Sequence, residues 1–245
     1  MSTFNDVTKT CILCFKESEQ VEINSTSSFG YDDLDFRPPM MARSTIFAWL
    51  EACPHCGYVA KDIFDPSCIQ AVKHVDVMRK IVSSESYKKC DNINFCSDYA
   101  SNFYRHHLIL LKSDNTEEAF LALRNAAWVC DDMGDEENAI ICRKKAIELI
   151  DRITSESFGK FDINRCPSRI IKFLYNKCIK RKGLPYAEYL DLVRLDMLRR
   201  TGDFERVTDE YSKKSYVSGM FNKALKFQLE KARLKDDSVY TFEDV

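Results

Sequence analysis

Apolar residues recur at spacings of three and four along most of the chain from about residue 62 onward. This spacing places apolar side chains on one face of a helix. The pattern is clearest over Gln70–Val82 and Phe95–Leu111. After the polar break near residue 114, Asn115 or Thr116 is suited to cap the N-terminus of the next helix. The pattern therefore predicts that most of the chain is helical.

Two Gly-Asp turns, which begin at Gly134 and Gly202, lie 68 residues apart. This separation is twice the roughly 34-residue period of tetratricopeptide repeats, in which each unit is a pair of antiparallel helices. The helices predicted around the two turns lie within Glu117–Ile153, Tyr186–Arg200 and Glu205–Lys213. Small residues that allow close helix approach fall at Ala127, Ala139 and Ala146.

The repeat pattern is interrupted between these two turns. A middle unit would place its first helix over Ser155–Pro167, where Gly159 and Pro167 disfavour a helix. A terminal helix is predicted over Phe221–Leu234, where it would cover the last repeat. The helical part is thus predicted to be a degenerate tetratricopeptide-like array. A plain helical bundle with one accidental match to the repeat is the alternative.

Two Cys-x-x-Cys pairs, Cys11/Cys14 and Cys53/Cys56, occupy the first quarter of the chain. Each such turn brings two thiolates to one ion, and Zn²⁺ in structural sites takes four tetrahedral ligands. A closed site of this kind contributes folding energy and does not activate water. A redox dithiol and two unrelated thiol pairs are the alternatives, but a redox dithiol needs only one pair in a thioredoxin-like setting. The spacing predicts one structural zinc per chain.

The residues around the two pairs suit a small β structure. Val21–Ile23 is predicted to be a strand that leaves the first pair, and Thr45–Leu50 a strand that leads into the second. Gly57 follows the second pair, where the backbone often needs a positive φ. His55 is expected to be a solvent-facing spacer, with metal ligation as the less favoured alternative.

The composition supports helices over a turn-rich β fold. The 245 residues include only seven Gly and six Pro, and 30% of them are charged. The predicted fold class is therefore mainly α. A small N-terminal β zinc-ribbon-like head, residues 1–62, is followed by a tetratricopeptide-like α-helical array, residues 63–245.

The charge and hydropathy of the chain disfavour polyanions and membranes as partners. The 36 basic and 38 acidic residues leave a net charge of −2, so no general attraction to polyanions is expected. No secretory signal is visible, and no stretch reaches the roughly 18 apolar residues of a membrane helix. We expect a cytoplasmic protein with reduced cysteines and without a membrane partner.

The motifs follow an order that resembles a known family. Asp33–Pro38 reads Asp-Leu-Asp-Phe-Arg-Pro, and Cys53–Ala60 reads Cys-Pro-His-Cys-Gly-Tyr-Val-Ala. With the first cysteine pair ahead of them, they resemble the uncharacterised bacterial family called domain of unknown function 2225, over most of the chain. The resemblance implies a zinc-ribbon-type head, tetratricopeptide-like helices and no established activity. Phe15 departs from the family's usual form, in which Gly is common at that position.

The segment 160–182 is the most basic part of the chain, with eight basic residues against Asp162 alone. On a helix, one face of the segment would present Arg169, Lys172, Lys177 and Lys180. A solvated face that balances acidic neighbours is the simplest interpretation. The alternative is a partner-binding surface for an acidic protein or, less favoured, for RNA.

The remaining reactive residues show no catalytic pattern. His106 and His107 are adjacent and point in different directions on a helix, so we expect structural roles. The acidic turn 131–137 lacks the alternating ligands of a calcium loop, which favours a solvated turn. The other cysteines lack metal-ligand spacing, although Cys90 and Cys96 could supplement a site: Cys68, Cys90, Cys96, Cys130, Cys142, Cys166 and Cys178.

Three functional hypotheses follow from these patterns. The first is a non-enzymatic zinc-binding scaffold that binds an unidentified protein or peptide partner through a concave helical face. The second is a nucleic-acid-associated protein that uses the segment 160–182. The third is an enzyme whose site forms only in three dimensions. The chain has no phosphate-binding Gly-rich loop, no Gly-x-Ser-x-Gly motif and no His-Glu-x-x-His motif, which disfavours an enzyme.

Overall fold

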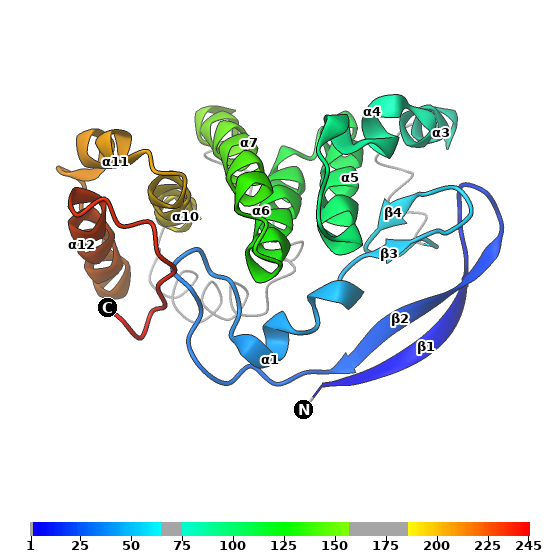
Figure 1. Ribbon diagram of the computed structural model, residues 1–245, viewed down its shortest axis with the longest axis horizontal. Coiled ribbons are helices and arrows are strands. Elements are labelled where there is room, and N and C mark those ends of the chain that lie inside the picture. Colours follow the sequence, from blue (N-terminus) through cyan, green and yellow to red (C-terminus); the bar gives the residue numbers. More distant parts are fainter. Residues whose placement is uncertain (1, 65–74, 157–185) are drawn as a thin grey trace. The chain divides into compact units, whose positions relative to one another are not determined.

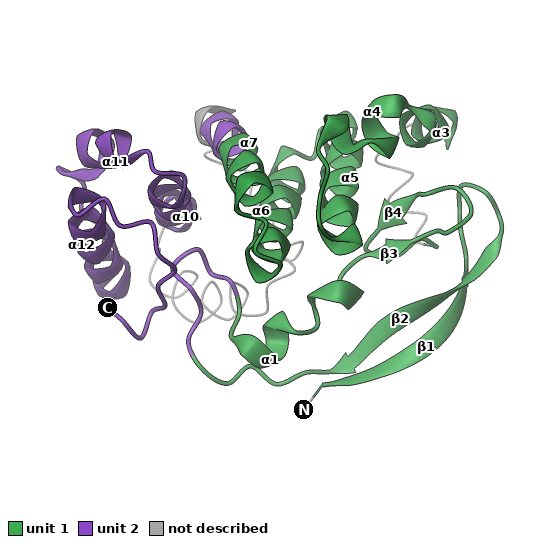
Figure 2. Ribbon diagram, viewed as in Figure 1, with its two compact units in different colours: residues 1–30, 38–146 green, residues 31–37, 147–245 purple. Residues whose placement is uncertain are grey.

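The computed structural model describes residues 2–64, 75–156 and 186–245 (Figure 1). The chain forms two compact units (Figure 2). Unit 1 contains residues 1–30 and 38–146, and unit 2 contains residues 31–37 and 147–245. The fold is mainly α with small two-stranded sheets near the N-terminus, as predicted. The boundaries of the two units differ from the boundary expected at residue 62. Whether residues 1–62 and 63–245 fold independently stays a prediction.

The sheets of unit 1 are two antiparallel pairs. Strands β1 (Thr3–Thr10) and β2 (Glu17–Ser25) form a long hairpin whose closing pair is Thr10 with Glu17. Strands β3 (Glu51–Ala52) and β4 (Val59–Ala60) form a short second pair. Each pair of strands brackets one Cys-x-x-Cys turn, and the strand predicted at residues 21–23 is confirmed as part of β2.

The strand predicted over Thr45–Leu50 is wrong. The short helix α1 (Met40–Arg43) ends just before this stretch, and the 3₁₀ turn η1 (Ile46–Ala48) lies within it. The Thr45 hydroxyl donates to the Ala42 carbonyl (2.8 Å) and accepts from the Trp49 indole N–H (2.9 Å). These local hydrogen bonds continue the helical turns past α1 and outweigh the β preference of the aromatic and branched residues.

The remaining described helices of unit 1 follow residue 74. They are α3 (Val75–Ser83), α4 (Glu85–Lys88), η2 (Cys90–Asn92), α5 (Asp98–Lys112) and α6 (Thr116–Asp132), followed by α7 (Glu136–Glu156), which continues into unit 2. Asn115 caps α6 as expected, because its side chain accepts from the Glu118 N–H (3.3 Å). Helices α5 and α6 pack side by side (Figure 1).

Unit 2 is built on three described helices besides the end of α7. They are α10 (Tyr186–Arg200), α11 (Phe204–Tyr211) and α12 (Gly219–Arg233), and each contacts the other two. Helix α12 confirms the predicted terminal helix. Most of α10 is buried, including its charged residues Arg194, Asp196 and Arg199. Arg194 is held by Asp151 (2.7 Å) and Glu210 (2.6 Å).

The two Gly-Asp turns have the same backbone hydrogen bonds. Gly134 (φ 68°) and Gly202 (φ 76°) both take the left-handed conformation that favours glycine. In each turn the glycine N–H donates to the carbonyl three residues earlier, and the following Asp N–H donates to the carbonyl five residues earlier, over 2.9–3.2 Å. The predicted small residues Ala127, Ala139 and Ala146 are buried. The geometry of the paired turns is thus the predicted one, while the type of repeat stays a prediction.

The described helices can be compared with the needs of a membrane span. No helix within residues 2–64, 75–156 and 186–245 is both long enough and apolar enough to cross a bilayer.

Candidate metal centre

The four predicted cysteines come together in unit 1. The Sγ atoms of Cys11, Cys14, Cys53 and Cys56 all lie within 4.8 Å of one another. The shortest separations join the two turns, at 3.7 Å between Cys11 and Cys56 and 3.6 Å between Cys14 and Cys53. Cys11 and Cys53 are buried, and Cys14 and Cys56 are half-buried. A single metal ion can be held by this group.

The two turns repeat one backbone pattern. In each, the N–H of the first cysteine donates to the carbonyl five residues later: Cys11 to Lys16 (2.9 Å) and Cys53 to Tyr58 (2.8 Å). The residue after the second cysteine then donates to the first cysteine's carbonyl and has a positive φ, 60° at Phe15 and 76° at Gly57. Phe15 therefore keeps the turn geometry of Gly57 although it carries a side chain.

A matched pair of substitutions tests the strain in these turns. We expect Gly57→Ala to lower the free energy of unfolding by about 1 kcal/mol, because an L-residue is disfavoured at this φ. No atom lies within 4 Å of the added Cβ, so the cost is the backbone's alone. Phe15→Gly is expected to relieve the same strain. Denaturant unfolding of both variants measures this, and equal effects of the same sign would contradict the account.

The protonation of the thiols differs across the group. Burial raises the pKa of the Cys11 and Cys56 thiols. Burial opposes ionisation of Cys14 as well, but hydrogen bonds from the Lys16 N–H and from neighbouring thiols outweigh it and lower the pKa of Cys14. Four thiolates this close repel one another, so a bound cation is needed to hold all four ionised.

A half-buried cation supports the approach of the two turns. Lys9 lies two residues before Cys11, and its Nζ contacts Glu51 Oε1 at 2.6 Å, Glu22 Oε1 at 2.7 Å and Asp62 Oδ1 at 3.3 Å. Glu51 is buried, and its other oxygen accepts from the Ile63 N–H (2.9 Å). Lys9 therefore ties β1 to β2, to β3 and to the chain that leaves β4.

Removal of this cation is expected to destabilise the centre. Lys9→Met leaves the buried Glu51 carboxylate without its charged partner, and breaking a buried pair in this way costs about 3 kcal/mol. The double variant Lys9→Met with Glu51→Gln should recover part of the loss. The free energies of unfolding of these two variants and of Glu51→Gln alone measure the coupling. Additive losses, with no recovery in the double variant, would show that the pair does not act as a unit.

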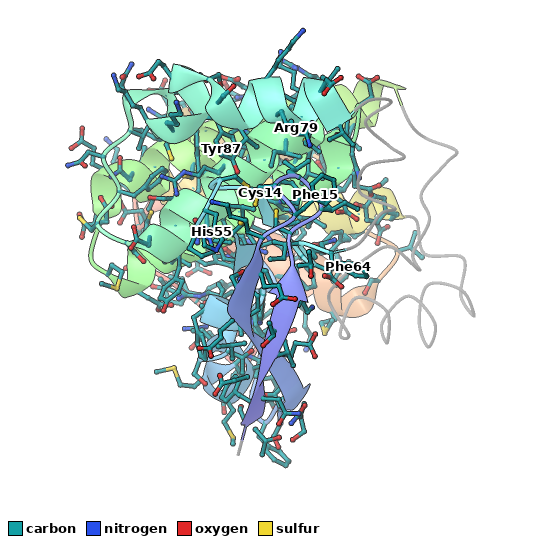
Figure 3. All side chains as sticks on the ribbon, turned by 90° about the vertical axis from the view of Figure 1, so that its right-hand side faces the viewer. Cys14, Phe15, His55, Phe64, Arg79 and Tyr87 are labelled. Carbon is teal, nitrogen blue, oxygen red and sulfur yellow. The ribbon has the colours of Figure 1, made fainter. Side chains whose placement is uncertain are left out.

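Two helical side chains bind the turns directly. Arg79 of α3 donates twice to the Leu13 carbonyl, from Nε (3.1 Å) and Nη2 (3.0 Å), and its guanidinium lies 5.9 Å from the centroid of the Phe15 ring. Tyr87 of α4 donates to the Gly57 carbonyl (2.8 Å). Figure 3 shows Arg79 and Tyr87 on the helices next to Cys14, Phe15 and His55. The sequence offered no signal for either residue, because each belongs to an ordinary helical pattern.

The cysteine group shares its core with helices. Buried residues of α3, α4 and α5 pack in one cluster with Cys11, Leu13, Cys53, Tyr58, Ala60 and Ile63. The helical members of the cluster are Met78, Val82, Tyr87 and Ile109. The cysteine group is thus part of the hydrophobic core of unit 1.

His55 is not one of the clustered residues. It is exposed, and its Nε2 lies 3.0 Å from the Glu17 carbonyl oxygen. Its position agrees with the expected role of a spacer. Of the residues that the structure describes, only the four cysteines form a His, Cys, Asp or Glu group that could hold a metal.

The adjacent histidines are buried in α5. His106 Nδ1 lies 3.3 Å from the Val59 carbonyl, and His107 Nδ1 lies 2.5 Å from the Tyr104 carbonyl. Burial lowers the pKa of His106 to about 3 and that of His107 to about 4. Both side chains are therefore neutral near pH 7 and are fixed by helix packing.

Within the described residues, the acidic turn and the cysteines outside the cluster do not form a second metal-binding group. Asp131 pairs with the buried Arg143 (3.0 Å), and Asp135 accepts from the Cys96 N–H (3.1 Å) and from Asn138 (2.9 Å). Cys130 and Cys142 are buried in the core. Cys90 is buried and Cys96 exposed, and neither joins the clustered cysteines.

Several residues singled out by the sequence lie outside the described part of the chain. They are Cys68, Cys166, Cys178 and the basic residues Arg169, Lys172, Lys177 and Lys180. The interpretation of the segment 160–182 as a partner-binding or RNA-binding surface therefore stays a prediction.

Comparison of the chain with protein-family models, with curated proteins and with solved structures gives no match.

Proposed function

We propose that the clustered cysteines hold one structural Zn²⁺ per chain. Four thiolate ligands around one ion are a common arrangement for structural zinc. With four protein ligands, no coordination position is left for water or a substrate, so the ion acts in folding. It joins Cys11–Cys14 to Cys53–Cys56, which the chain separates by 38 residues.

We further propose that the protein is a non-enzymatic protein-interaction or scaffold protein. The observation that carries this proposal lies in unit 2, where α10, α12 and the C-terminal residues bind the loop Tyr31–Arg37. A helical surface that holds one such loop has the features needed to hold a peptide of another protein. The tetratricopeptide-like repeat type and the relation to domain of unknown function 2225 belong to this proposal, which the paired Gly-Asp turns support.

Cross-linking of the full chain to its partner tests this function. With the tagged protein as bait in a lysate of its source cells, we expect cross-links on Lys223 and Lys226, which are exposed on α12. Lys16, exposed beside the first cysteine turn, is the control position and should be little linked. Binding that survives nuclease treatment supports a protein partner. Binding lost with nuclease would contradict it and favour the nucleic-acid hypothesis.

A further inference from the structure

The segment Tyr31–Arg37, called the inserted segment below, is part of unit 2 although the chain on both sides of it belongs to unit 1 (Figure 2). Its two ends are close: a Cβ built on Gly30 would lie 3.2 Å from the Cβ of Pro39. Gly30 has a φ of 107°, which only glycine adopts readily. The segment is therefore a loop whose ends meet and whose middle packs elsewhere, and it can be removed without breaking the path of unit 1.

Main-chain hydrogen bonds attach the inserted segment to the C-terminal residues. The Leu34 N–H donates to the Tyr240 carbonyl (2.9 Å), and the Phe242 N–H donates to the Asp32 carbonyl (2.9 Å). Asp33 and Thr241 face each other in an antiparallel bridge between these bonds. Addition of a short strand to an exposed backbone edge is a common way to bind a peptide, because these bonds do not depend on its sequence.

Phe36 is the anchor of the inserted segment. Its ring lies 4.7 Å from that of Tyr189, 5.1 Å from that of Phe242 and 5.8 Å from that of Phe221, measured between centroids. The side chain is buried, and its backbone has a φ of 64°. A buried aromatic side chain in such a pocket supplies much of the binding energy of a peptide.

A tight turn inside the segment presents this anchor. The Phe36 N–H donates to the Asp33 carbonyl (2.8 Å), the Asp33 N–H donates to the Arg37 carbonyl (2.9 Å), and the Arg37 N–H donates to Asp35 Oδ1 (3.2 Å). These bonds are internal, so the segment forms its own turn. A peptide with the same acidic and aromatic residues carries the same turn-forming groups.

The receiving surface has contacts that hold it without the inserted segment. The buried Arg199 of α10 donates to the carbonyls of Asp236 (2.9 Å) and Ser238 (2.8 Å) and to Asp196 (2.8 Å). The Tyr240 hydroxyl donates to Asp236 (2.7 Å). The C-terminal backbone edge is thus fixed on α10 by residues that are not part of the segment, as expected of a preorganised site.

We propose that the surface formed by α10, α12 and residues 236–242 is a binding site for an acidic–aromatic peptide of a partner protein, and that the inserted segment is its internal occupant. This proposal rests on the protein-interaction function proposed above. It names the class of partner and the internal segment that competes with that partner for the site. A partner displaces the inserted segment and pairs with the same backbone edge. Its aromatic side chain takes the place of Phe36 among Tyr189, Phe221 and Phe242.

The tether determines how strongly the inserted segment competes with a partner peptide for the surface. The inserted segment competes at an effective concentration on the order of 1 mM, as expected for a short tether. A peptide with a Kd of about 10 µM for the vacant surface would then bind the intact chain roughly 100-fold more weakly, because the apparent affinity falls with the vacant fraction.

Peptide binding to full-length variants tests the proposal. In one variant, residues 31–38 are replaced by two glycines; in a second, Phe36→Ala weakens the anchor alone. The probe is a fluorescent peptide with the sequence of Tyr31–Pro38, measured by anisotropy. We expect binding to both variants, at least 10-fold tighter than to the unmodified chain. The control peptide, which carries Ala in place of Phe36, should lose at least 10-fold in affinity.

The outcomes separate this proposal from the general function. Folded variants that fail to bind the peptide overturn it. Variants that lose their helical signal and do not regain it with peptide also overturn it, because the segment would then be an ordinary part of the core. Complex formation only between a glycine-replaced copy and an intact copy would identify a second chain as the occupant and contradict the partner peptide. If the peptide binds but cross-linking finds no protein on α12, the site stands and the proposed function fails.

Discussion

Cys53→Ser is expected to abolish metal binding and to unfold much of unit 1. Zinc binding to structural sites contributes apparent free energies of about 10–16 kcal/mol in small zinc peptides, and loss of one of the four ligands removes a large part of that energy. The cysteine group shares its core with Met78, Tyr87 and Ile109. We therefore expect the amides of α3, α4 and α5 to lose hydrogen-exchange protection together with those of β3 and β4.

The matched control for this variant is Cys96→Ser. Cys96 is exposed and lies outside the clustered cysteines, so its replacement should leave metal content and amide protection unchanged. If Cys53→Ser loosened only the strands and left α3 to α5 fully protected, the strands would form an independently folding head and the shared core would carry little energy. That outcome would support the boundary predicted at residue 62.

Arg199→Met is expected to have the largest effect in unit 2. Arg199 is fully buried, and its loss leaves the buried Asp196 carboxylate and the Asp236 and Ser238 carbonyls without their donor. Breaking a buried ion pair in this way costs about 3–5 kcal/mol. Burial raises the pKa of Asp196, and the Arg199 charge acts against this rise, so the variant should raise it further. Denaturant unfolding followed by helical signal measures the loss.

Two controls accompany this variant. Arg233→Met removes an exposed arginine from α12 and should change the free energy of unfolding by less than about 0.5 kcal/mol. The double variant Arg199→Met with Asp196→Leu removes the unpaired charge and should recover part of the stability. A cost for Arg199→Met as small as that for Arg233→Met would show that Arg199 does not fix the C-terminal residues on α10.

Local patterns in the sequence predicted the features whose chemistry is local. A Cys-x-x-Cys turn brings its own thiols together, and a Gly-Asp turn needs only the positive φ of Gly134 or Gly202. The turns, the helices around them and the four clustered cysteines could therefore be predicted. Over Thr45–Leu50 the aromatic and branched residues predicted a strand, but hydroxyl and indole hydrogen bonds outweigh their β propensity there.

Contacts between distant parts of the chain could not be predicted in this way. Arg79 and Tyr87 reach the cysteine turns only because α3 and α4 pack on them. Asp32 pairs with Phe242 across almost the whole sequence. The Asp-Leu-Asp-Phe-Arg motif carries part of the family resemblance. Nothing in its local sequence predicts that it packs against the helices and C-terminal residues of unit 2.

Native mass spectrometry of the full chain, purified without chelators, tests the central claim most directly. The account predicts that the folded chain carries one zinc ion, and that denaturation releases it and frees the four clustered thiols to react, along with the buried Cys90, Cys130 and Cys142. A folded chain whose mass matches the metal-free protein, or one that contains a disulfide among Cys11, Cys14, Cys53 and Cys56, would contradict the account.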